Sequence, residues 1–99
     1  LGMTPGANFG ANNAAIFEAV HGSAPDIAGR NLANPLALIM SGVMMMRHLA
    51  DTSGEASYGT VADRIRDAYN ACLVAGEKTR DLGGTLGTVE FTDAVIARL

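Results

Sequence analysis

Apolar residues recur every three to four positions in three stretches of the chain, and this spacing predicts three helices. The helices are expected over residues 35–50, 60–75 and 88–99. The residues expected on their buried faces are Leu36, Ile39, Met40, Val43, Met46 and Ala50, then Val61, Ile65, Ala68, Tyr69, Cys72 and Leu73, and finally Phe91, Val95 and Leu99. Further apolar residues flank the first set, so the first helix is expected to be buried on most of its faces.

The remaining stretches are short or polar. Residues 16–20, Ile-Phe-Glu-Ala-Val, predict a short buried strand. Residues 1–13 are rich in Gly and Asn and predict a loop, and residues 51–59 predict a polar linker. Asn34 and Pro35 predict the start of the first helix, because Asn can accept an amide hydrogen bond there and Pro loses nothing by lacking its N–H. The chain is therefore expected to be mostly helical, with one or two short strands.

Composition narrows the class of protein. The 99 residues are 48% hydrophobic and 17% charged, with a net charge of −3, which is typical of a globular chain and not basic enough to favour nucleic acid. No run reaches the roughly 18 apolar residues of a membrane span, so neither nucleic acid nor a membrane is expected as a partner. The single Cys excludes an internal disulfide framework. The 12 glycines, the low aromatic content and the missing initiator Met lead us to expect a C-terminal piece of a longer protein.

The candidate chemistry lies between the predicted strand and the first helix. Residues 21–35 read His-Gly-Ser-Ala-Pro-Asp-Ile-Ala-Gly-Arg-Asn-Leu-Ala-Asn-Pro. Gly gives access to unusual backbone angles and Pro fixes one, so such a loop is suited to holding a ligand-shaped surface. No glycine-rich dinucleotide fingerprint, Walker motif or metal-ligand spacing occurs in the sequence. The residues alone therefore indicate a ligand-binding loop that suits a nucleotide.

Asp26 is the first candidate in this loop. A carboxylate can accept hydrogen bonds from both hydroxyls of an adenosine ribose, and it would repel a 2′-phosphate. At about 4 Å that repulsion is worth about 1 kcal/mol in water and about 4 kcal/mol at an effective dielectric near 20. The alternative is a turn aspartate that satisfies nearby amides.

Three further residues have both structural and functional interpretations. His21 is either a structural hydrogen-bonding group or a contact to a purine. Asn34 can cap the helix while its backbone meets an adenine edge. Glu18 stands in an apolar run, where an unpaired buried carboxylate is costly, so a salt bridge to an arginine is favoured over catalysis. The alternatives are a partner in the rest of a longer protein and the ribose of a bound cofactor.

The chain resembles the isocitrate/isopropylmalate dehydrogenase family, the decarboxylating β-hydroxyacid dehydrogenases. The resemblance is carried by residues 5–10, 16–29, 33–35, 44–49, 81–84 and 90–92. Pro-Gly-Ala-Asn at 5–8 and Phe-Glu-Ala at 17–19 resemble isocitrate dehydrogenases in particular. The resemblance implies an α/β parent fold that is not a Rossmann fold, with residues 1–99 as the C-terminal part of the large, cofactor-binding domain.

The same resemblance implies a site for the adenosine half of NAD. His21 would lie against the adenine, Asp26 would take the ribose hydroxyls, and Asn34 would read the adenine edge. Asp-Ile at 26–27 is the NAD-type pair of the family, and Glu18 would lie towards the nicotinamide. The cofactor-binding residues implied are His21, Gly22, Ser23, Ala24, Asp26, Ile27, Ala33, Asn34 and Glu18.

The implied activity belongs to a longer parent chain. It is NAD-dependent oxidative decarboxylation of isocitrate to 2-oxoglutarate, and the alternatives are isopropylmalate, homoisocitrate or tartrate dehydrogenase, or a non-catalytic regulatory subunit. The catalytic residues and the Mg²⁺ or Mn²⁺ ligands of the family match nothing in this chain, so the piece alone is expected to be inactive. The expected partners are NAD and a small 2-hydroxy di- or tricarboxylic acid. The parent is expected to be a homodimer or hetero-oligomer in the bacterial cytoplasm or the mitochondrial matrix.

Overall fold

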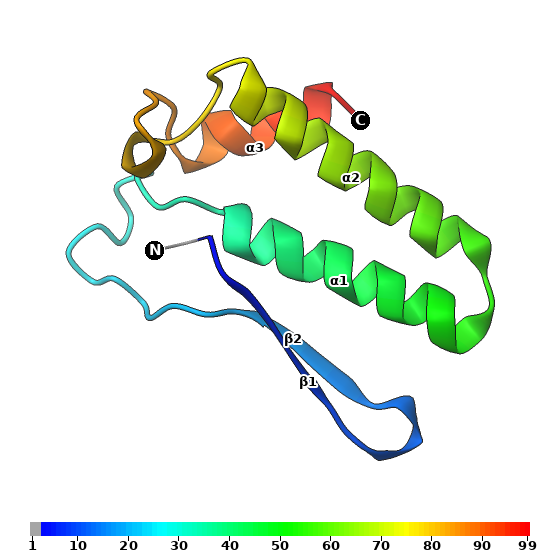
Figure 1. The fold of residues 1–99 in the computed structure, drawn as a ribbon. Helices are drawn as coiled ribbons and strands as arrows, with labels where there is room; N and C mark the ends of the chain where they lie inside the picture. Colours follow the sequence, from blue (N-terminus) through cyan, green and yellow to red (C-terminus); the bar gives the residue numbers. More distant parts are fainter. Residues whose placement is uncertain (1–2) are drawn as a thin grey trace.

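The computed structural model describes residues 3–99 as a β-hairpin followed by three α-helices (Figure 1). The prediction of a mostly helical chain with one or two short strands is confirmed. The helix α1 lies between the hairpin on one side and α2 on the other, and α3 packs against α2. The elements are β1 (Pro5–Phe9), the 3₁₀ turn η1 (Ala11–Asn13), β2 (Ala15–Ala19), α1 (Leu36–Ser53), α2 (Ala56–Val74), the 3₁₀ turn η2 (Arg80–Leu82) and α3 (Thr88–Ala97).

The prediction of a loop over residues 1–13 is wrong at Pro5–Phe9, which form the strand β1; the other described residues of this stretch lie outside the strand. The strands β1 and β2 pair antiparallel, with Pro5 opposite Ala19 and Phe9 opposite Ala15. Asn12 and Asn13 adopt left-handed conformations, with φ of 57° and 65°, and reverse the chain. Gly and Asn favour loops locally, but pairing with a neighbouring strand outweighs such local preferences.

The strand predicted over residues 16–20 is present one residue earlier, and it is not fully buried. Its side chains alternate, so that Phe17 is half-buried while Ile16 is 66% exposed. Glu18 is exposed as well, which removes the reason to expect a salt bridge at this position. One face of the hairpin packs on α1, where the Ser41 hydroxyl lies 2.8 Å from the carbonyl oxygen of Glu18.

His48 joins the tip of the hairpin to α1. Its Nε2 lies 2.9 Å from the carbonyl oxygen of Asn13. The His48 ring also lies against both hairpin aromatics, with centroid distances of 5.4 Å to Phe9 and 5.6 Å to Phe17. The turn of the hairpin is therefore held by a side chain 35 residues further along the chain.

The boundary between the first two helices differs from the prediction. The linker predicted over residues 51–59 shrinks to two residues, because α1 continues to Ser53 and α2 begins at Ala56. The hydroxyls of Thr52 and Ser53 donate to the carbonyls one turn earlier, which lets these polar residues stay helical. Gly54, with φ of 74°, takes the left-handed conformation that ends α1.

The core lies where the three helices meet. It consists of Leu36, Val43, Ala62, Ala68, Tyr69, Cys72, Phe91 and Val95. The predicted stripes are wrong at two positions: Val61 is 39% exposed while its neighbour Ala62 is buried, and Leu99 is 50% exposed beyond the end of α3. Residues 36–50 of α1 are buried or half-buried, as predicted, except Leu38 and Met45, which are exposed. None of the helices within residues 3–99 is long and apolar enough to cross a membrane.

Candidate functional site

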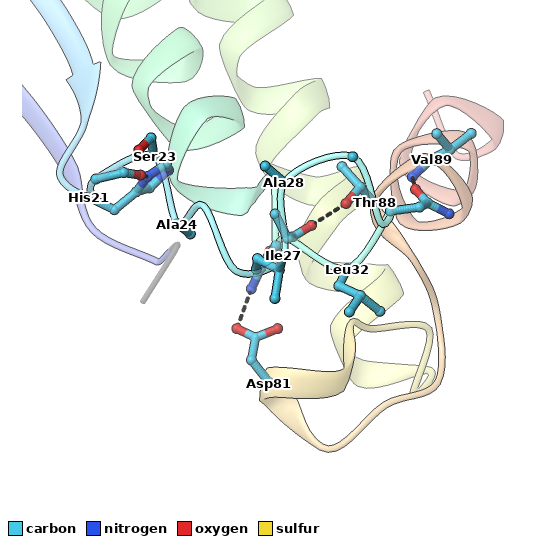
Figure 2. A pocket seen from close by; sticks show the side chains of 14 residues that line it. His21, Ser23, Ala24, Ile27, Ala28, Leu32, Asp81, Thr88 and Val89 are labelled. Carbon is cyan, nitrogen blue, oxygen red and sulfur yellow. Dashed lines mark hydrogen bonds between the residues drawn. The ribbon is translucent and has the colours of Figure 1, made fainter.

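The irregular segment from His21 to Pro35 borders a pocket of about 820 Å³ (Figure 2). Two C-terminal pieces complete the pocket: η2, which contributes Asp81, and the first turn of α3, which contributes Thr88 and Val89. The pocket therefore joins parts of the chain separated by more than 45 residues. The lining residues are His21, Gly22, Ser23, Ala24, Ile27, Ala28, Gly29, Asn31, Leu32, Ala33, Asn34, Asp81, Thr88 and Val89.

Seven of the nine residues implied by the family resemblance line this one pocket. They are His21, Gly22, Ser23, Ala24, Ile27, Ala33 and Asn34. The other seven lining residues were not predicted as site residues: Ala28, Gly29, Asn31, Leu32, Asp81, Thr88 and Val89. Asp81 belongs to a segment that carries the resemblance, but nothing in the spacing placed it beside the loop.

Asn34 is buried and fixes one end of the loop through both ends of its side-chain amide. Its Oδ1 accepts a hydrogen bond from the Leu36 N–H at 2.9 Å, which confirms the capping role predicted for Asn34. The helix begins one residue later than predicted, at Leu36, with Pro35 at the N-cap position. Its Nδ2 donates to Asp81 at 3.1 Å, and the other oxygen of that carboxylate accepts from the buried Thr79 hydroxyl at 2.5 Å. The side chain of Asn34 is thus occupied within the fold, and its backbone groups remain for a ligand.

Asn31 and Thr88 fix the other side of the loop to α3. The Asn31 Oδ1 accepts from the Val89 N–H at 2.8 Å, and its backbone carbonyl accepts from the Thr88 N–H at 3.1 Å. The Thr88 hydroxyl donates in return to the carbonyl of Ala33 at 2.5 Å. Figure 2 shows the hydrogen bonds at Thr88 and Val89, which join the loop to the first turn of α3.

The outer part of the loop is exposed and bent. Ala24, with φ of 44°, and Gly29, with φ of 75°, take left-handed conformations that turn the chain around the pocket. The Nδ1 of His21 lies 2.7 Å from the carbonyl oxygen of Gly22. Because a carbonyl only accepts, Nδ1 carries a proton in this contact.

Asp26 and Glu18 do not line the pocket. Asp26 is exposed, and its side chain takes no part in the hydrogen bonds formed among residues 3–99, so it does not act as a turn aspartate. It stands next to the lining residue Ile27. The carboxylate of Glu18 is exposed and forms none of the ion pairs among the same residues, so the predicted bridge to an arginine is wrong.

The pocket is suited to binding more than to acid–base or metal chemistry of its own. Its one carboxylate, that of Asp81, is held by Asn34 and Thr79. Residues 3–99 contain no group of three His, Cys, Asp or Glu side chains placed to hold a metal ion. The resolved pKa shifts lie elsewhere: burial raises the pKa of the Cys72 thiol in the helical core.

Comparison with known proteins defines the class. The model of the isocitrate/isopropylmalate dehydrogenase family matches residues 1–95, and the chain belongs to this family. The fold agrees with the assignment. A crystal structure of isocitrate dehydrogenase from Methylococcus capsulatus is 42% identical, with a TM-score of 0.83 over 98% of this chain. A β-decarboxylating dehydrogenase from Thermococcus kodakarensis is 39% identical, with a TM-score of 0.79 over 95% of the chain.

The curated relatives are subunits of NAD isocitrate dehydrogenases. Subunit 2 of the mitochondrial enzyme of Kluyveromyces lactis is 52% identical, and catalytic subunit 5 of Arabidopsis thaliana is 49% identical. One of the relatives is a regulatory subunit, from the mitochondrial enzyme of Dictyostelium discoideum, and it is 50% identical. Each match covers all of this chain, which spans about a quarter of each relative (25%, 25% and 26%). Identity therefore does not separate catalytic from regulatory relatives.

Proposed function

We propose that this chain is the C-terminal part of the cofactor-binding domain of an NAD-dependent isocitrate dehydrogenase, and that its pocket binds the adenosine half of NAD. The observation that carries the proposal is the gathering of seven expected cofactor residues around one pocket of about 820 Å³. The names of the relatives, which are NAD isocitrate dehydrogenase subunits, support NAD as the cofactor.

The residues of the pocket divide the work of binding. Ile27 and Ala33 supply apolar contacts for the adenine, and His21 lies against its edge. The backbone N–H and carbonyl of Asn34 read the adenine, because its side chain already serves Leu36 and Asp81. A mostly apolar pocket with a few fixed polar groups is typical of sites for small organic ligands.

Asp26 selects NAD over NADP in this proposal. Asp26 is exposed and precedes the lining residue Ile27, and its carboxylate makes no hydrogen bond among the described residues, so it can accept from the two ribose hydroxyls. A 2′-phosphate at the same place would meet like charge, at a cost between about 1 and 4 kcal/mol. Glu18, outside the pocket, would lie towards the nicotinamide half.

The reaction itself needs parts of the parent outside residues 1–99. We propose that the parent oxidises isocitrate and decarboxylates it to 2-oxoglutarate with Mg²⁺ or Mn²⁺, as a homodimer or hetero-oligomer of the mitochondrial matrix or the bacterial cytoplasm. The isolated piece is expected to be inactive, since the family resemblance assigns the catalytic and metal-binding residues to other segments of the parent. A regulatory subunit is the second candidate, because the Dictyostelium regulatory subunit is 50% identical. Metal-binding aspartates upstream of residue 1 would decide for the catalytic type.

The proposal is tested by calorimetric titration of this chain with NAD and with NADP. We expect NAD to bind at least tenfold more tightly than NADP, which corresponds to about 1.4 kcal/mol. Asp26→Ala is expected to weaken NAD and to remove most of the preference. Asp51→Ala, an exposed carboxylate at the far end of α1, is the matched control. Equal binding of the two cofactors would overturn the role of Asp26, and absence of NAD binding would overturn the cofactor site.

A further inference from the structure

The first turn of α3 meets the loop through a set of contacts that NAD binding as proposed above does not require. Asn31 uses three groups at this junction: its Oδ1 accepts from the Val89 N–H, its carbonyl accepts from the Thr88 N–H, and its Nδ2 donates to Glu90 Oε1 at 2.7 Å. A helix leaves its first N–H groups without intrahelical partners. Asn31 therefore caps α3 from far earlier in the chain.

Glu90 determines which way the Asn31 amide points. A carboxylate only accepts and the Val89 N–H only donates, so the amide has one orientation that satisfies both. Glu90 also lies in the first turn of α3, where the helix dipole favours a negative charge. Asn31 itself is held in a left-handed conformation, with φ of 56°, which is costly without such support.

Gly87 allows this close approach. A Cβ at this buried position would meet Asn31 Nδ2 and Glu90 Oε1, and it would lie 2.6 Å from the backbone oxygen of Asn31. Separations of that size are not tolerated between real atoms, so any larger residue would push the loop and α3 apart. The junction thus depends on residues from both sides of the contact.

We propose that Glu90 is a positioning residue for the cofactor loop: it acts through Asn31 to fix the part of the loop that lines the pocket. Asn31, Leu32 and Ala33 are lining residues, whereas Glu90 is not. Removing the Glu90 carboxylate releases the Asn31 amide, and the left-handed residue beside the pocket then loses one of the contacts that hold it. Only the predicted loss of nucleotide affinity rests on the proposed function; the predicted loosening of the loop does not.

The test uses this chain with the substitutions Glu90→Ala, Glu90→Gln and Asp93→Ala. Asp93 is an exposed carboxylate on the same helix and makes no hydrogen bond with its side chain among residues 3–99, so it is the matched control. Two readouts are taken: amide hydrogen exchange without ligand, and titration with AMP followed by amide chemical shifts. The expected changes for Glu90→Ala are at least threefold faster exchange at Val89 and in residues 27–34, and about tenfold weaker AMP binding.

Glu90→Gln keeps the acceptor oxygen, so its amide exchange and AMP affinity are expected to stay within about twofold of those of the unsubstituted chain. Asp93→Ala should change neither. Unchanged exchange in residues 27–34 of Glu90→Ala would overturn the positioning role, whether or not AMP binds. If amide exchange rises in Glu90→Ala but the unsubstituted chain does not bind AMP, the proposed function fails, whereas the positioning of the loop by Glu90 through Asn31 is supported. Equal AMP affinity in Glu90→Ala and the unsubstituted chain would also contradict the positioning role of Glu90.

Discussion

The helical core and the cofactor loop are held in different ways. The core is made by burial: Leu36, Cys72 and Phe91 are at most 1% exposed and come from three different helices. The loop has little burial of its own, since most of residues 21–33 are exposed. It is held at its C-terminal end by polar contacts of Asn31 and Asn34 to η2 and α3. A segment that lacks a core can therefore still present a defined pocket, provided that a packed element stands behind it.

The largest loss of stability is expected from Phe91→Ala, because this substitution leaves a cavity in the core and weakens the packing of α3, the helix that supports the loop. Phe91 is fully buried, and truncation of such a side chain costs about 3–5 kcal/mol. That is a large part of the roughly 5–15 kcal/mol that stabilise a typical domain. Urea unfolding followed by circular dichroism measures the loss. Val89→Ala, at a position 56% exposed on the same helix, should change stability by less than about 0.5 kcal/mol.

Asn34→Ala is expected to have the next largest effect, because Asn34 belongs to both regions. It removes the cap on the Leu36 N–H and leaves Asp81 without one partner, at a cost of about 1–2 kcal/mol. Thermal unfolding measures the cost. Asn34→Asp keeps the cap but sets a second carboxylate against Asp81, so it should not restore the stability. Full restoration by Asp would show that the contact to η2 contributes nothing.

Cys72 should give the core a weakness at alkaline pH that the loop does not share. Burial raises the pKa of its thiol above the ordinary value of 9.0, so the unfolded chain loses this proton first as the pH rises. The stability that the protonated Cys72 thiol contributes to the folded state is therefore fully present below pH 9.0 and is lost as the pH rises above this value. Between pH 7 and 10, the free energy of unfolding should fall less steeply in Cys72→Ala than in the unsubstituted chain. Parallel pH profiles would contradict this.

The smallest effect is expected from the surface pair that joins α1 to α2. Arg47 and Asp63 lie 2.9 Å apart, with side chains 41% and 51% exposed. Solvent screens such a pair, so Arg47→Ala should cost no more than about 0.5 kcal/mol in urea unfolding. A loss above about 1.5 kcal/mol would mean that surface charge contributes to the core as much as a buried hydrogen bond.

Sequence periodicity predicts the core better than it predicts the edges. Phe91 and Val95 are predicted correctly, because an apolar stripe reports which face a helix buries. The hairpin was not predicted, because β1 is formed by pairing with β2, whereas its Gly- and Asn-rich sequence locally favours a loop. The loop is found from its residues and from the family resemblance. Its supports at Asp81, Thr88 and Glu90 could not be found, since long-range hydrogen bonds leave no period in a sequence.

Binding of an adenosine nucleotide by the pocket is tested by titrating this chain with AMP and following the chemical shifts of its backbone amides. At about 0.3 kcal/mol per non-hydrogen atom, the roughly 19 atoms of adenosine correspond to a Kd near 0.1 mM. We predict saturable shifts confined to the loop residues 21–34 and to residues 81, 88 and 89, a set that includes every residue lining the pocket. Shifts centred on the cleft of Phe9, Phe17 and His48, or no shift at several times that concentration, would contradict the account.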